Sequence, residues 1–265
     1  MNSGLPLRSF PFDGEGVTAV VTTRHGGVSV GPYASLNLGA QVGDDQHAVR
    51  QNRGRVAAAL GVDRLTIAAQ QHTNRVAVVD RANAGRGHDG VAGSVSAFPS
   101  TDGLVTDLPG TALAVVVADC APVVLFDPVQ RAIGVAHCGR AGTVSGMLPN
   151  TVEAMAGAFG SAPGDLLVGI GPAIRAESYE VSDLEAAEVT AAFGPDAAGL
   201  LTPTRPGHYL LDLVGGLRIQ LRAAGVKDAN VHDTGIDTRT NAGEFFSHRV
   251  TRPTGRFAAV ALLPS

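Results

Sequence analysis

Residues 114–127 read AVVVADCAPVVLFD and place Cys120, one of only two cysteines in the chain, between two apolar runs. Both runs are rich in valine, and β-branched residues favour strands. A cysteine of the hydrophobic core would usually lie inside such a run, whereas Cys120 follows Asp119 and stands just before Pro122. The pattern predicts two strands with a break between them, at which the Cys120 side chain faces a cleft.

Similar apolar runs recur along the chain. They predict strands at residues 17–23, 76–79, 112–117, 123–126, 132–137, 166–170, 231–233 and 257–263, most of them bounded by Gly, Pro or Asp. Helical patterns occupy residues 46–60, 144–159, 183–193 and 211–224. Strands that alternate with helices indicate an α/β or α+β sheet protein. We interpret the glycine- and serine-rich residues 83–100 as a surface loop, and we expect residues 1–265 to form a single domain.

The composition excludes several classes of protein. Of the 265 residues, 45% are hydrophobic and 17% are charged, which is typical of a globular chain. A net charge of −4 argues against binding to nucleic acid. Two cysteines cannot form a disulfide framework, and the apolar runs are too short to cross a bilayer. We therefore expect a cytoplasmic protein, a monomer or small homo-oligomer, with neither nucleic acid nor membrane as a partner.

Three residues of the types that bind zinc stand at strand ends or breaks. They are His72 in QQHTNRV, Cys120, and His137 in AIGVAHCGRAG. Three protein ligands leave the fourth position of zinc open for water. The intervals of 48 (120 − 72) and 17 (137 − 120) residues match no local metal motif, so hydrogen-bonded histidines remain an alternative. Cys138 competes for the thiol role, but neighbours in a strand point to opposite faces, which favours a core position for Cys138.

An anion site is the second candidate. Residues 138–142 read CGRAG before the helix expected from about residue 144, where Gly139 and Gly142 would let backbone N–H groups approach an anion and Arg140 would add charge. The turn is not a P-loop, because the Gly-Lys-Ser/Thr ending is missing. Arg24 and Arg249 also stand beside strand-like runs. The alternatives are an ordinary glycine turn and solvated surface arginines.

Taken in order, many short motifs match one family. They are TTRHGGVS, PYASLNLG, VGDD, QQHTNRV, TDGLVTD, ADCAPVVLFDP, GVAHCGRAG, GIGPAI, SYEV, FFSHR and TGRFAAVALL. The chain thus resembles the YfiH- and YlmD-like "laccase domain" (polyphenol oxidase-like) family of purine nucleoside phosphorylases. The resemblance implies an α/β domain with a mixed β-sheet core flanked by helices. It also implies a catalytic zinc ion bound by His72, Cys120 and His137.

The resemblance further implies two activities. One is a transferase activity, in which adenosine, inosine, guanosine or S-methyl-5′-thioadenosine reacts with phosphate to give the base and ribose 1-phosphate or its 5-methylthio analogue. The other is a hydrolase activity, the deamination of adenosine, for which zinc would lower the pKa of a bound water. Phosphate must be held near C1′ of the ribose, and the candidates for substrate binding are Arg24, Asn37, Gly139, Arg140 and Gly142. Asn37 would otherwise hold a turn. Asp119 would either orient a zinc ligand or cap the turn.

The chain departs from the family pattern at three places. The usual His-Ala-Gly-Trp-Arg-Gly reads HCGRAG at residues 137–142, the usual Cys-Thr is Asp233-Thr234, and the usual Ser-Tyr-Arg-Arg reads SHRV at residues 247–250. The zinc ligands survive these changes. The changes affect which substrates the resemblance can predict for this chain and how fast they would react.

Three other functions remain as alternatives. A copper-dependent phenol oxidase would need many histidines, usually in His-x-His pairs, and this chain has no such pair. Copper is nonetheless kept as the alternative to zinc. In a metal-free enzyme, Cys120 would act as nucleophile with His72 or His137 as its base. A purine- or metal-binding module without catalysis is the third alternative.

Overall fold

Three β-sheets organise the chain in the computed structural model, which describes residues 4–90 and 98–265. The strands of the five-stranded sheet, in spatial order, are β1 (Leu7–Ser9), β2 (Thr18–Thr22), β14 (Phe257–Leu262), β6 (Ala112–Val117) and β3 (Leu65–Ile67). Those of the six-stranded sheet are β13 (Val231–Asp233), β9 (Leu167–Ile170), β7 (Ala121–Asp127), β8 (Ala132–Cys138), β5 (Gly103–Thr106) and β4 (Val76–Val78). The three-stranded sheet consists of β10 (Glu180–Ser182), β12 (His208–Leu211) and β11 (Leu201–Arg205).

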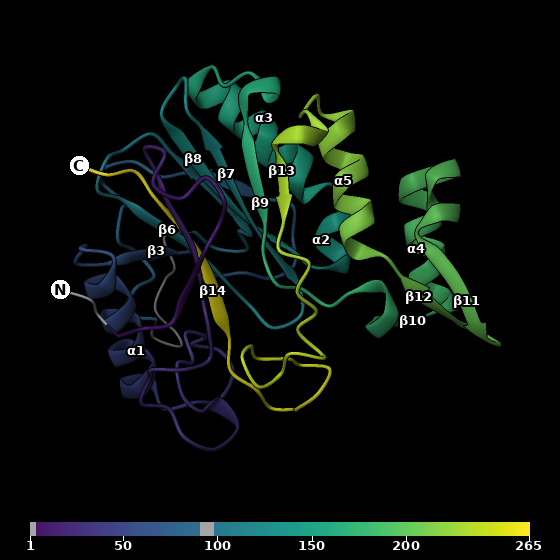
Figure 1. Ribbon diagram of the computed structural model, residues 1–265, viewed down its shortest axis with the longest axis horizontal. Coiled ribbons are helices and arrows are strands. Elements are labelled where there is room, and N and C mark those ends of the chain that lie inside the picture. The colour runs from purple at the N-terminus through teal and green to yellow at the C-terminus, as the bar shows by residue number, and fades with distance from the viewer. Residues whose placement is uncertain (1–3, 91–97) are drawn as a thin grey trace.

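Helices cover the outer faces of the two larger sheets (Figure 1). Helix α1 (Gln46–Ala59) packs on the five-stranded sheet, and α3 (Met147–Phe159) and α5 (Leu213–Ala223) pack on the six-stranded sheet. Helix α4 (Asp183–Phe193) packs on the three-stranded sheet, and the short α2 (Arg140–Val144) follows β8. Short 3-10 helices occupy Gly31–Tyr33, Pro163–Asp165, Ala176–Ser178, Gly194–Gly199 and Asp228–Asn230. The expected α/β class, with mixed sheets flanked by helices, is confirmed.

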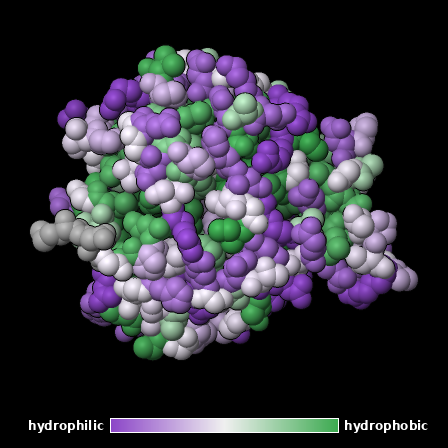
Figure 2. Space-filling view, in the orientation of Figure 1, coloured by the Kyte–Doolittle hydropathy of each residue, from purple (hydrophilic) through white to green (hydrophobic). Residues whose placement is uncertain are grey.

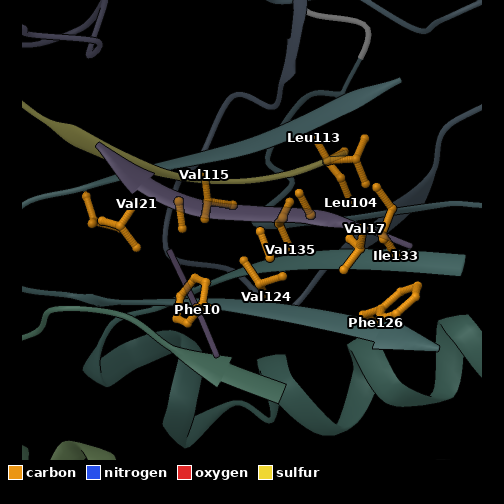
Figure 3. Packing of buried hydrophobic residues seen from close by; sticks show 14 of the residues in the cluster. Phe10, Val17, Val21, Leu104, Leu113, Val115, Val124, Phe126, Ile133 and Val135 are labelled. Carbon is orange, nitrogen blue, oxygen red and sulfur yellow. The ribbon is translucent and has the colours of Figure 1, made fainter. Parts of the chain in front are cut away.

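The largest hydrophobic cluster fills the space between the two larger sheets (Figure 3). Leu113 and Val115 of β6 point into this cluster, whereas Ala112 and Ala114 point to the side of α1. Successive residues of a strand face opposite sides of the sheet, and here both sides are covered. This arrangement explains why β6 and β7 read as unbroken apolar runs.

The break at Cys120 is a crossing between sheets. The expected break is confirmed, and the strand after it belongs to a different sheet from β6. Strand β6 pairs with β14 and β3, whereas β7 pairs with β8 and β9. Residues 118–120 alone connect them, and Asp119 adopts a φ of 83°, in the left-handed region. A side chain at this crossing lies at the rim of both sheets.

All the predicted strands and helices have counterparts, with boundary shifts of a few residues. One helix differs, because Gly146 (φ 84°) interrupts the segment expected to start at Val144, so that α2 and α3 are separate. The strands that the sequence did not predict, β1, β3, β5, β10, β11 and β12, are three to five residues long. Residues 91–97 of the predicted surface loop lie outside the described residues.

The three-stranded sheet and α4 extend from the side of the molecule. Figure 2 shows hydrophilic residues gathered over the end of the β11–β12 hairpin, where exposed Arg205 pairs with Glu180 at 2.7 Å. Over residues 4–90 and 98–265, we find no helix with the length and apolar character needed to span a bilayer.

Candidate metal centre

The three predicted metal ligands converge at one edge of the sheets. Strands β3 and β6 are parallel, so that their carboxyl ends meet, and after each of them the chain crosses to the six-stranded sheet. His72 lies in the first crossing and Cys120 ends the second. Strand β8 runs antiparallel to β7, with His137 paired to Pro122, which brings His137 beside Cys120. The pairing of distant strands thus brings together three residues that are 48 and 17 positions apart in the sequence.

The donor atoms of these residues lie within 4.8 Å of one another. His72 Nε2 is 3.9 Å from Cys120 Sγ, and the two imidazole centroids are 4.7 Å apart. Bond lengths of about 2.0–2.3 Å in a tetrahedral zinc site would put the ligand atoms about 3.3–3.6 Å apart. Small side-chain rotations suffice to close that difference. His72 has a φ of 59°, a conformation that non-glycine residues rarely adopt except where surrounding structure holds them.

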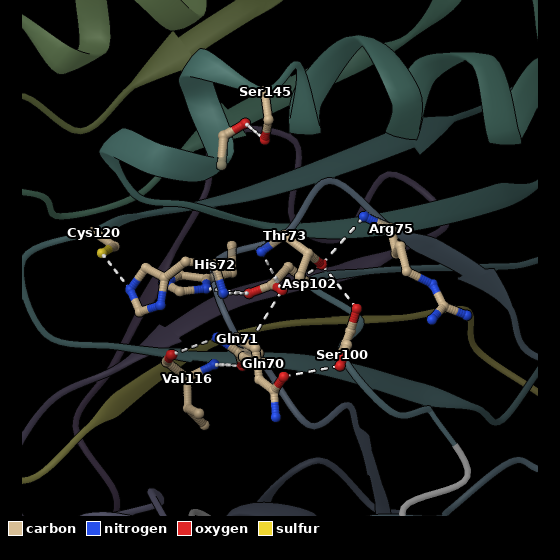
Figure 4. Close-up of polar contacts among 12 residues, drawn as sticks. Gln70, Gln71, His72, Thr73, Arg75, Ser100, Asp102, Val116, Cys120 and Ser145 are labelled. Carbon is tan, nitrogen blue, oxygen red and sulfur yellow. Dashed lines mark hydrogen bonds and ion pairs between the residues drawn. The ribbon is translucent and has the colours of Figure 1, made fainter. Parts of the chain in front are cut away.

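Asp102 lies beside His72 and Thr73 and has no exposed surface (Figure 4). Its Oδ1 is 2.7 Å from His137 Nδ1 and accepts a hydrogen bond of 3.0 Å from the backbone N–H of His72. Its Oδ2 accepts hydrogen bonds from the backbone N–H of Gln71 and from both the N–H and the hydroxyl of Thr73. With Nδ1 donating to Asp102, His137 directs Nε2 toward Cys120 and the metal position. Such carboxylate–histidine pairs fix the tautomer of a metal ligand.

The sequence analysis did not identify Asp102. Its one signal was its place in the TDGLVTD motif, directly before a short apolar run, and many structural aspartates occupy such positions. Gln70 was missed as well. Its side chain forms two hydrogen bonds with the backbone of Val116 in β6 and thereby fastens the loop that carries His72.

Electrostatics favours a thiolate at Cys120. Burial alone would raise the pKa of this thiol, but His137 and His72 outweigh it and lower the pKa to about 6. Burial likewise opposes protonation of His137, yet Cys120 and Asp102 raise its pKa to about 9. Burial also disfavours the charged Asp102, but the hydrogen bonds from His137 and the loop 71–73 lower its pKa to about 2. Cys138 behaves oppositely, because burial strongly raises the pKa of its thiol.

These residues fit a zinc ion. Two imidazoles and a thiolate are the ligands that zinc prefers, and three of them leave one coordination position open. Cys138 is fully buried among the apolar residues beneath α3 and α5, on the opposite side of β8 from His137. The predicted divergence of the two neighbouring side chains is therefore observed.

The predicted glycine turn is the start of α2. The helix begins at Arg140, with Gly139 as its N-cap, and not near Val144. A Cβ atom on Gly139 would lie 2.7 Å from Cys120 Sγ and 3.1 Å from His72 Cδ2, so glycine is required here by space. Arg140 forms ion pairs with Glu185 (3.3 Å) and Glu188 of α4, which offset its charge. Gly142 lies in α2 against backbone oxygens of neighbouring segments.

Arg24 and Asn37 are held by protein groups. Arg24 donates from Nε to the carbonyl of Ala34 (3.0 Å) and from Nη1 to that of Ala242 (2.6 Å), and its guanidinium stacks over Phe246. Fully buried Asn37 donates to Gly39 and Asp44 through its amide nitrogen. Its amide oxygen accepts hydrogen bonds from the backbone N–H of Gly39 and of Arg256.

Asp119 anchors a distant segment beside Cys120. Its carboxylate accepts hydrogen bonds from the Thr238 hydroxyl (2.6 Å), the Ser247 hydroxyl (2.7 Å) and the backbone N–H of Arg249 (2.7 Å). The Arg249 guanidinium lies 5.2 Å from the centroid of the Tyr179 ring. Asp119 thus positions the segment 238–249 next to the candidate metal centre.

Known proteins resemble this chain over nearly its whole length. The family described as multi-copper polyphenol oxidoreductase laccase matches residues 18–264. Purine nucleoside phosphorylase ORF3 of Streptomyces griseus is 41% identical over 244 residues, covering 91% of this chain and 92% of that protein. Purine nucleoside phosphorylase YlmD of Geobacillus stearothermophilus is 38% identical over 247 residues, with coverages of 92% and 89%.

Solved structures share the fold. The hypothetical protein YfiH of Bacillus licheniformis superposes with a TM-score of 0.91 at 33% identity, covering 97% of this chain and 99% of that chain. The structure of Geobacillus stearothermophilus YlmD also gives a TM-score of 0.91, at 36% identity and 97% coverage of both chains. These similarities confirm the resemblance that the sequence motifs indicated.

Proposed function

Because the chain belongs to the family described as multi-copper polyphenol oxidoreductase laccase, in which its relatives are named purine nucleoside phosphorylases, we propose that it is a zinc-dependent purine nucleoside phosphorylase. Its substrates would be adenosine, inosine, guanosine or S-methyl-5′-thioadenosine together with phosphate. The observation that carries the proposal is the convergence of His72, Cys120 and His137, with Asp102 bonded to His137.

His72, Cys120 and His137 would hold the zinc ion, which when bound supplies a Lewis acid at the rim of the two sheets. Asp102 keeps His137 oriented through Nδ1 and holds the loop of His72 through backbone N–H groups. The neighbouring Gly139 has no side chain that could obstruct the donor atoms. Zinc fits better than a copper cluster, because among the described residues only this group of three could hold a metal ion.

In phosphorolysis, an oxygen of hydrogen phosphate forms a bond to C1′ while the bond from C1′ to the base nitrogen breaks. The base leaves with the bonding electron pair and takes up the proton that hydrogen phosphate gives. Positive charge develops on the ribose at the transition state beside the phosphate anion, and arginines and backbone N–H groups can hold that phosphate in position. Arg24, Asn37, Gly139, Arg140 and Gly142 remain the proposed contributors to substrate binding. Of these, Gly139 lies nearest to the three metal ligands, against Cys120 and His72.

The test is incubation of purified protein of known metal content with adenosine, in phosphate buffer and in buffer free of phosphate. Adenine and ribose 1-phosphate that form only with phosphate would support the proposal. Inosine in both buffers would add deamination of adenosine, which we propose as an accompanying activity. Neither product, from protein that holds one zinc per chain, would refute both activities.

The same samples distinguish the alternatives. Stoichiometric copper with oxygen consumption on phenols would indicate a phenol oxidase. Turnover that survives removal of the metal by a chelator, together with rapid alkylation of Cys120, would indicate a cysteine nucleophile. Binding of purine nucleosides without turnover would indicate a binding module.

A further inference from the structure

The candidate arginines differ in how many of their hydrogen-bond donors the protein already uses. Arg140 is paired with two carboxylates, and Arg24 uses both Nε and Nη1 on backbone carbonyls. Arg249 is exposed, lies over Tyr179 and donates from Nη2 to the carbonyl of Glu180 (3.1 Å). An oxyanion substrate needs a guanidinium whose charge is not offset and whose donors are available.

Arg256 meets that requirement. It lies directly before β14, and Phe257 of β14 pairs with Val117 of β6, so that Arg256 stands beside the chain that continues into Cys120. Burial lowers the pKa of Arg256, whereas Cys120, Asp119 and Tyr33 raise it. Among the described residues, no carboxylate forms an ion pair with Arg256.

The Arg256 side chain is held in place while one edge stays available. Its Nη1 donates to the carbonyls of Thr254 (2.9 Å) and Gly255 (3.0 Å). Within the described part of the chain, neither Nε nor Nη2 has a hydrogen-bond partner. These two groups form one edge of the guanidinium, which matches two oxygens of a phosphate.

The backbone around Arg256 is fixed by the segment that contains Asn37, which the sequence analysis proposed for substrate binding. Its N–H donates to Asn37 Oδ1 (2.8 Å), and its carbonyl accepts from the N–H of Leu38 (2.9 Å). A Cβ on Gly39 would lie 2.6 Å from Arg256 Cγ, so the SLNLG segment leaves space for this side chain. Asn37 therefore holds the backbone of Arg256.

We infer that Arg256 binds the phosphate substrate through its Nε–Nη2 edge, beside the metal centre, with Asn37 and Gly39 as positioning residues. This inference rests on the proposed phosphorylase function, and it names the residue that holds the inorganic substrate. A bidentate, charge-assisted contact of this type supplies affinity for phosphate but none for the nucleoside.

The experiment compares Arg256→Gln and Arg256→Lys with the wild type and with Arg252→Gln. Arg252 is an exposed neighbour that donates from Nε to the carbonyl of His248, and it serves as the matched control. With zinc content verified, KM is measured for phosphate at saturating adenosine and for adenosine at saturating phosphate. The increase in melting temperature on addition of phosphate is measured on the same proteins, and it requires no turnover.

We expect Arg256→Gln to raise KM for phosphate at least tenfold and to abolish the stabilisation by phosphate, with KM for adenosine changed less than twofold. Arg256→Lys should lie between Arg256→Gln and the wild type, and Arg252→Gln should match the wild type. The inference is overturned if Arg256→Gln keeps the wild-type response to phosphate, or if Arg140→Gln produces the phosphate defect instead. If the wild type shows no phosphorolysis, the proposed function fails, and the phosphate-dependent melting temperature still decides whether Arg256 binds the anion.

Discussion

Asp102→Asn should be the most informative substitution in this protein. The Asp102 carboxylate is the acceptor for five donors, on His72, His137, Gln71 and Thr73. Asparagine offers one oxygen and turns its amide N–H groups toward the remaining donors, so that two or three buried donors lose their acceptor. Each loss costs roughly 1–3 kcal/mol, and breaking a buried pair costs about 3–5 kcal/mol in total.

We therefore expect Asp102→Asn to lower the free energy of unfolding by about 3–5 kcal/mol. Because His137 loses its orienting partner, zinc affinity should fall roughly 10- to 100-fold. The measurements are urea denaturation of the metal-free protein and competition with a zinc chelator. Wild-type values in both would refute the assignment of Asp102 as the residue that positions the ligands.

Asp127→Asn is the matched control. Asp127 is equally buried, at the far end of β7, and its Oδ1 accepts hydrogen bonds from the backbone N–H groups of Val129 and Gln130. Its Oδ2 has no hydrogen-bond partner among the described residues. An asparagine can keep the oxygen on Oδ1 and place its NH₂ group at Oδ2. The control should therefore retain zinc and lose little stability.

The pH dependence of stability gives a second test of Asp102. Its pKa is lowered to about 2 in the folded protein, from 3.8 in the absence of structure. A lowered pKa means that the ionised carboxylate stabilises the fold above pH 4 and that this contribution disappears as the pH falls toward 2. The shift corresponds to about 2 kcal/mol. Unfolding of Asp102→Asn should lack this part of the acid dependence.

Three further predictions follow from the site. Cys120→Ala should lose both zinc and activity, whereas Cys138→Ala should keep both. Metal analysis and the adenosine assay would check this prediction. Loss of zinc in Cys138→Ala alone would contradict the ligand assignment. Gly139→Ala should weaken zinc binding because its Cβ would lie 2.7 Å from Cys120 Sγ, while Gly157→Ala, with no atom within 4 Å of its Cβ, should leave zinc affinity unchanged. The pKa of Cys120 is lowered to about 6 and that of His137 is raised to about 9, so near pH 7.5 the thiol is ionised and the imidazole is protonated. Zinc binding at this pH should therefore release about one proton, from His137. Calorimetry in buffers of different ionisation enthalpy would measure it.

The sequence by itself identified most of the strands and helices and the α/β class, because apolar runs with turn residues between them report burial directly. It also singled out His72, Cys120 and His137, since few other residues of the chain combine metal-binding chemistry with a position at a strand end. The prediction that residues 1–265 form one domain stays a prediction. Sequence patterns failed for β11, which is largely exposed and so lacks a strong apolar pattern. They also failed for the buried strands β3 and β5, which are only three and four residues long.

Only the tertiary structure decided what lies around those three residues. Cys120 ends a crossing between two sheets, because β6 and β7 take their hydrogen bonds from different partners, and pairing between distant strands leaves no trace in a local pattern. Asp102 and Arg256 could not be recognised from the sequence. A carboxylate that accepts five hydrogen bonds, or a guanidinium whose Nε and Nη2 have no partner among the described residues, reads in a sequence like any other acid or base. Local composition determines which segments are buried and extended, whereas the register between strands determines which charges meet.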